Sequence, residues 1–103
     1  MADNWFRHDQ GARMDSKMRY IVQRHTVAGT GLFWMLVEMM RDEFGKSGKH
    51  GIELGKIEMS VLSGDSGLSQ DKIDEMLSDF VECGLFVIED GRYISNRLRH
   101  EML

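Results

Sequence analysis

The tripeptide Gly45-Lys46-Ser47 is the first group of residues in this sequence whose types and spacing suggest chemistry. A phosphate-binding P-loop ends in the same way, because its lysine and its hydroxyl hold the phosphates and the metal ion of a nucleotide. The complete motif also needs a glycine five positions earlier, where this chain has Met40, and a strand before the loop. A helical pattern precedes Gly45 instead, so the sequence predicts no nucleotide site.

Histidine and cysteine side chains form the second group. His8, His25, His50 and His100 are scattered, and none has the spacing to Cys83 that zinc ligands show. Cys83 follows a predicted helix and has apolar neighbours, which favours a small buried side chain over a nucleophile. Serines are present, but no Gly-x-Ser-x-Gly elbow accompanies them. We therefore expect no catalytic residue, no metal, no cofactor and no enzymatic activity.

The third group is a run of acidic residues in a helix predicted over 69–82. Its charged residues are Lys72 and five carboxylates, Asp71, Asp74, Glu75, Asp79 and Glu82. Such a helix repels phosphates and releases no counterions on contact with DNA. The carboxylates are then either a solvated face or, at Asp71, Asp74, Glu75 and Asp79, a contact surface for a protein. Base contacts from the start of this helix, at Ser69, Gln70 and Lys72, stay open as an alternative.

Hydrophobic spacing predicts the helices that must position these groups. The first begins at Asp15 or Ser16 and runs to about His25. Residues 27–31 contain two glycines and predict a break, with Thr30 as the cap of a central core helix over 31–44. A polar loop over 45–51, a short strand or turn near residue 52 and a short helix from about residue 55 follow. A turn at 63–67 precedes the fourth helix, which Ser69 caps and Gly84 ends.

The sequence predicts a closing hairpin after the fourth helix. Residues 85–88 are aliphatic and aromatic, as strands favour, and residues 93–95 form the return strand. Asp90-Gly91 stands between them, and both residues tolerate the positive φ of a two-residue turn. Asn96 is expected to cap a last helical piece over 97–103, and residues 3–6 are expected to form a short edge strand at most.

This order of elements favours one winged-helix-like domain over residues 1–103. A short helix, a turn and a second helix are typical of a helix-turn-helix, and the hairpin takes the place of a wing. The fold class is therefore mainly α with a C-terminal β-hairpin (α+β). The sequence has one cysteine, no signal-peptide core and no long apolar run, so we expect a cytoplasmic protein outside the membrane.

Charge is unevenly distributed along the chain. Residues 26–90 contain five Lys/Arg and thirteen Asp/Glu, whereas basic residues exceed acidic ones in both terminal segments. Any nucleic acid would have to meet those termini, because phosphate contacts need lysine or arginine. The candidate contacts are Arg7, Arg13, Lys17, Arg92, Arg97 and Arg99. The alternative is a solvated surface with local ion pairs to Asp9 and Asp15.

Three blocks of the sequence support a family resemblance. They are Trp5-Phe6-Arg7-His8-Asp9 with Ala12-Arg13, Asp15 and Lys17; Gly29-Thr30-Gly31-Leu32-Phe33-Trp34 with Leu36, Glu38 and Met39; and Asp79-Phe80 and Gly84-Leu85-Phe86 with residues 90–95. Together they resemble the N-terminal domains of phage and prophage replication-initiation proteins of the DnaD-like, replisome-organiser type. The resemblance implies a winged-helix-like domain, with further sequence after it in most members, that helps to assemble a replication complex.

Two hypotheses of function follow. In the first, the chain is a phage-type DNA replication module that acts through protein contacts, with itself or with a host replication protein, and through weak, salt-sensitive DNA binding. A homodimer is compatible with this hypothesis, because the wing and the first strand offer free edges. In the second, it is a small acidic phage-borne protein that binds and inhibits or redirects a host nucleic-acid-binding protein.

Overall fold

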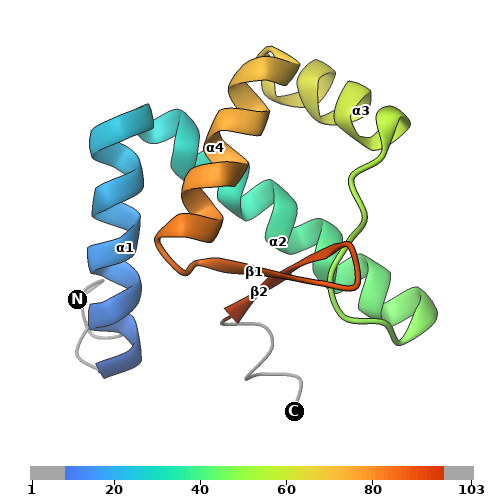
Figure 1. Cartoon of the computed structure of the whole chain (residues 1–103), viewed down its shortest axis with the longest axis horizontal. Coiled ribbons are helices and arrows are strands. Elements are labelled where there is room, and N and C mark those ends of the chain that lie inside the picture. Colours follow the sequence, from blue (N-terminus) through green and yellow to red (C-terminus); the bar gives the residue numbers. More distant parts are fainter. Residues whose placement is uncertain (1–8, 97–103) are drawn as a thin grey trace.

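The computed structural model describes the backbone of residues 9–96 and the side chains of residues 16–96. Four helices are followed by an antiparallel hairpin (Figure 1): α1 (Asp9–His25), α2 (Val27–Ser47), α3 (Lys56–Ser66), α4 (Gln70–Glu82), β1 (Phe86–Glu89) and β2 (Arg92–Ser95). The predicted winged-helix-like α+β fold is confirmed. The expected strand over 3–6 and the helix over 97–103 fall outside the described residues.

The first two helices differ from the prediction at their boundaries. Helix α1 begins at Asp9, before the expected start, and α2 begins directly after Thr26. The prediction of a break over 27–31 with Thr30 as cap was wrong, because Thr26 makes the turn with a φ of 63°. Gly29 lies inside α2 for a packing reason: a Cβ there would stand 2.5 Å from Cγ2 of Ile21 on α1. The glycine therefore permits a close approach of two helices.

Helix α2 supplies the centre of the core, as its apolar spacing predicted. Its buried apolar side chains are Leu32, Phe33, Leu36, Val37 and Met40. The ring of Phe33 lies 5.9 Å from that of Phe80 on α4 and 5.4 Å from that of Phe86 on β1. These offset and edge-on contacts join three elements into one apolar cluster. Helix α2 is thus the central helix of the fold, against which α4 and β1 pack.

Helices α3 and α4 form the helix-turn-helix unit. Helix α3 extends through the predicted turn to Ser66, and Gly67 ends it in the left-handed conformation with a φ of 76°. The hydroxyl of Ser69 accepts a hydrogen bond from the backbone N–H of Lys72, which confirms the predicted cap of α4. The core-facing side of α4 carries Ile73, Met76, Leu77 and Phe80, and Asp79 is buried beside them.

The hairpin closes the domain with the expected turn. Asp90 and Gly91 have φ values of 52° and 74°, and Glu89 pairs with Arg92 on either side of them. Both positive φ values fit a tight two-residue turn. A further bridge joins Ile52, before α3, to Tyr93 on β2. The hairpin is consequently tied to the α2–α3 connection as well as to α4.

Within the described range 9–96, no helix is long and apolar enough to cross a membrane.

Candidate interaction surface

The acidic residues of α4 divide between its solvent side and its core side. Asp71, Asp74, Glu75 and Glu82 are exposed. Lys72, the basic residue of this helix, donates to Oε1 of Glu75 at 3.1 Å, so its charge is engaged by a neighbour. In the position of a recognition helix, the domain therefore presents carboxylates to solvent.

Asp79 was predicted to belong to the acidic contact surface of α4, but its side chain does not lie on the exposed face. Its side chain is buried, and Oδ2 accepts from Nε of Arg24 at 2.9 Å and contacts Nε2 of His25 at 2.5 Å. The Arg24 guanidinium lowers the pKa of this carboxyl, burial opposes that effect, and His25 adds to it. Asp79 therefore joins α4 to the end of α1 and is not placed to contact a partner. Its spacing of three from Met76 puts it on the core side, a signal that the charge count overlooked.

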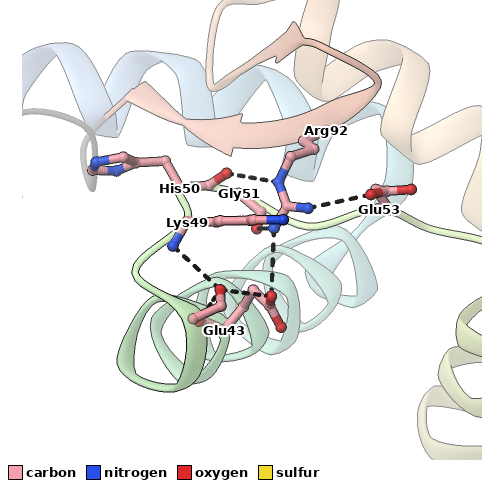
Figure 2. Close-up of polar contacts among 7 residues, drawn as sticks. Glu43, Lys49, His50, Gly51, Glu53 and Arg92 are labelled. Atoms are coloured by element: carbon pink, nitrogen blue, oxygen red, sulfur yellow. Dashed lines mark hydrogen bonds and ion pairs between the residues drawn. The ribbon is translucent and has the colours of Figure 1, made fainter.

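Arg92 was expected to contact DNA from the wing, but it is bound inside the domain (Figure 2). Its Nε donates to the carbonyl of His50 at 2.9 Å and its Nη2 to that of Gly51 at 2.7 Å. Glu53 and Glu43 lie 3.3 and 3.6 Å from its two Nη atoms. All the polar groups around Arg92 that Figure 2 marks are thus intramolecular. The Arg92 side chain is 15% exposed, and each of its three nitrogens has a partner within the domain, so this arginine holds the hairpin to the α2–α3 connection.

Lys17 is the other predicted DNA contact whose side chain is described. Its Nζ donates to the carbonyl of Gly84 at 3.1 Å, next to the amide of Asn96, which donates to the same oxygen at 2.6 Å. Gly84 precedes β1, whereas Arg92 follows the hairpin turn, so the two cations are at opposite ends of the hairpin (Figure 1). They do not form one patch. Arg7, Arg97 and Arg99, and the side chain of Arg13, lie outside the described residues.

Helix α3 carries a pair of exposed apolar side chains that was not predicted from the sequence. Ile57 is 76% exposed and Val61 is 53% exposed, four residues apart on one face. Met59 and Leu62 face the core from the opposite side of the helix. The signal was present in the sequence: residues 57–62 contain four apolar side chains, too many for one face of a surface helix.

A groove of about 450 Å³ lies beside this helix. It runs between the second half of α2, the connection before α3 and the first turn of α3. Met39 and Ile52 contribute apolar surface to the groove. Its charged lining consists of four carboxylates, at Asp42, Glu43, Glu53 and Glu58, and two cations, at Lys46 and Arg92, and Arg92 is paired with Glu43 and Glu53. Carboxylates therefore outnumber cations in the groove.

The model of the family described as Lin1244/Lin1753-like, N-terminal, matches residues 5–98. The chain belongs to this family. No curated protein and no solved structure matched the chain. The match covers the three sequence blocks on which the resemblance to replication-initiation domains rests, and it names the family without naming a function.

The other residues of this Lin1244/Lin1753-like domain that the sequence analysis considered for nucleotide binding, nucleophilic attack or metal binding make contacts within the fold. Gly45-Lys46-Ser47 forms the last turn of α2, where the Ser47 hydroxyl donates to the backbone carbonyl of Glu43 at 3.0 Å. Burial raises the pKa of the Cys83 thiol, which keeps it protonated and weakly nucleophilic. Over residues 16–96, no three His, Cys, Asp or Glu side chains are grouped to hold a metal ion. The described surface presents carboxylates and a few large apolar side chains to solvent.

Proposed function

We propose that this chain is the winged-helix module of a phage-type DNA replication-initiation or replisome-organiser protein. It acts mainly by assembling proteins, and DNA contact is an auxiliary activity of its basic termini. The observation that carries the proposal is the exposed acidic face of α4, formed by Asp71, Asp74 and Glu75. A helix with that charge in the recognition position is suited to basic protein surfaces and unsuited to phosphates.

The internal position of Arg92 supports the same proposal. A wing that reads DNA needs a free cation near its turn, whereas here Arg92 donates to the carbonyls of His50 and Gly51. Lys17 is similarly engaged by Gly84. The resemblance to DnaD-like replication proteins supplies the biological setting, and the family is itself described as an N-terminal one. Weak DNA binding is compatible with the internal contacts of Arg92 and Lys17, since Arg97 and Arg99 follow the hairpin in the sequence and can supply phosphate contacts.

The proposal is tested by fluorescence anisotropy with single- and double-stranded DNA at low and at physiological salt. We expect weak binding that decreases with salt and is reduced further in an R97A/R99A variant. Arg92 is left intact in this variant, because its loss would disturb the fold. The D71N/D74N/E75Q variant is expected to bind DNA more tightly than the wild type, since it lacks three repulsive charges. Tight, sequence-specific binding by the wild type at physiological salt would overturn the proposal.

Capture of purified host replication proteins is the second arm of the test. The D71N/D74N/E75Q variant is expected to lose a partner that the wild type binds, and the partner's contact surface is expected to be basic. Inhibition of that partner's own nucleic-acid binding would instead favour the alternative function, a phage-borne protein that redirects a host protein. The exposed carboxylates of α4 serve either function, and the effect on the partner's activity separates them.

A further inference from the structure

We propose that the outer face of α3, with the groove between α2 and α3, is a second docking surface for a basic, amphipathic helical segment of a partner protein. This inference rests on the proposed assembly function and deepens it by naming a surface other than α4. Three observations carry it: an apolar pair that the domain leaves uncovered, acidic residues along one side of that pair, and a groove whose lining includes Glu58, the neighbour of Ile57.

The apolar pair is not explained by packing within the domain. Ile57 and Val61 are both more than half exposed, while Met59 and Leu62 make the core contacts of the same helix. Gly64 lies on the same face, one turn beyond Val61, and a Cβ added to it would meet no atom within 4 Å. A neighbouring helix can approach closely at that point. Exposed apolar residues at helical spacing are typical of helix-on-helix recognition.

Charge decides the chemistry of the partner. Successive residues of a helix are rotated by 100°, which places Glu58 and Asp65 on the same side of α3, next to Val61. Glu58 lines the groove together with Asp42 of α2, and carboxylates outnumber the two cations of the lining, Lys46 and Arg92. Carboxylates border the apolar pair along this side, so lysine or arginine residues flanking an apolar stripe would complement it.

A second copy of this chain fits the surface poorly. In a two-fold antiparallel pairing of α3 with itself, the same side of each helix meets its counterpart, so Glu58 of one copy would approach Asp65 of the other. That arrangement places like charges together around a small apolar contact. Nucleic acid is disfavoured for the same reason, because these carboxylates repel phosphates. The basic amphipathic helix is the occupant that satisfies both the apolar and the acidic groups.

The probe for this surface is a fluorescein-labelled peptide of leucine, lysine and alanine, with leucine at helical spacing and lysine on both flanks. We expect it to bind the full chain, and we expect the variants I57S/V61S and E58Q/D65N each to weaken binding about tenfold. Two matched variants serve as controls: V27S removes another exposed apolar side chain, and E38Q/E82Q removes two exposed carboxylates that belong to neither proposed surface. Both are expected to change binding by less than about twofold.

The outcomes that would contradict the proposal can be distinguished from one another. Equal binding of a shuffled peptide of the same composition, or equal loss in E38Q/E82Q, would overturn the α3 surface and leave the proposed assembly function standing. A wild-type dimer in sedimentation velocity that I57S/V61S abolishes would assign the face to a second copy and overturn the basic-helix occupant. Circular dichroism of E58Q/D65N, which alters only exposed residues, verifies that any loss of binding is not a loss of fold.

Discussion

Nε2 of His25 lies 2.5 Å from Oδ2 of Asp79, and both side chains are buried where the end of α1 meets α4. The same carboxylate oxygen accepts from Nε of Arg24 at 2.9 Å, and the Arg24 guanidinium lies 5.5 Å from the centre of the Tyr20 ring. One carboxylate thus organises three side chains of α1.

The Asp79→Asn variant is expected to be less stable than the wild type by about 1–3 kcal/mol, because it leaves the buried His25 and the half-exposed Arg24 without a charged acceptor. Urea unfolding followed by circular dichroism measures this difference. Asp74→Asn on the exposed side of α4 is the matched control and is expected to fall within about 0.5 kcal/mol of the wild type. An equal effect of both substitutions would mean that the contact with α1 contributes nothing specific.

Acid should weaken the wild type more than the Asp79→Asn variant. Arg24 and His25 lower the pKa of Asp79 in the folded state, so the folded protein holds this group ionised more strongly than the unfolded chain does. The stabilisation is complete above the ordinary aspartate pKa of about 3.9 and is lost as the pH falls through the lower folded value. Unfolding midpoints measured from neutral pH downward should therefore converge for the two proteins in acid. Parallel curves would contradict the assignment.

Arg92→Lys is expected to destabilise the hairpin nearly as much as Arg92→Ala. The guanidinium donates through separate nitrogens to the carbonyls of His50 and Gly51, a geometry that a single ammonium does not reproduce. Hydrogen exchange should accelerate at the amides of Ile52 and Tyr93, which bond to each other's carbonyls in the bridge that Arg92 supports. The control is Arg19→Ala at an exposed position of α1. Full rescue by lysine would show that charge alone matters.

Gly29 and Gly31 should respond to alanine in opposite directions, although both lie in α2. A Cβ at Gly29 would meet the stiff side chain of Ile21, so Gly29→Ala is expected to cost about 1–3 kcal/mol. A Cβ at Gly31 would meet nothing within 4 Å, and Gly31→Ala is expected to stabilise by about 0.5–1 kcal/mol. Thermal unfolding of the two variants provides the comparison. A stabilised Gly29→Ala would show that α1 and α2 are not closely packed.

The sequence predicted the class of fold because its strongest signals are local. Asp90-Gly91 determined the turn, Ser69 determined the start of α4, and the apolar spacing of α2 identified the core helix. The boundary between α1 and α2 was missed because a glycine such as Gly29 is compatible both with a break between helices and with the close packing of two helices. The position of Ile21 against Gly29 in the structure distinguishes these two possibilities.

The candidate site was predicted less well, because charge was counted without direction. Asp71, Asp74 and Glu75 are exposed as expected, whereas Asp79 points to α1. Arg92 was a candidate DNA contact because it belongs to the basic C-terminal segment, and its acceptors are backbone carbonyls more than forty residues earlier in the chain. No local pattern encodes such a long-range contact. The apolar pair on α3 was detectable from its excess of apolar residues, but its exposure depends on how α3 packs.

The hairpin is held at both ends by side chains from different elements. Lys17 of α1 binds the carbonyl of Gly84 before β1, and Arg92 after the turn binds the backbone that follows α2. The paired strands therefore connect two regions that lie far apart across the domain (Figure 1). The hairpin thus links α1 to the backbone after α2, and we expect the loss of either cation to loosen the hairpin at the end that it holds.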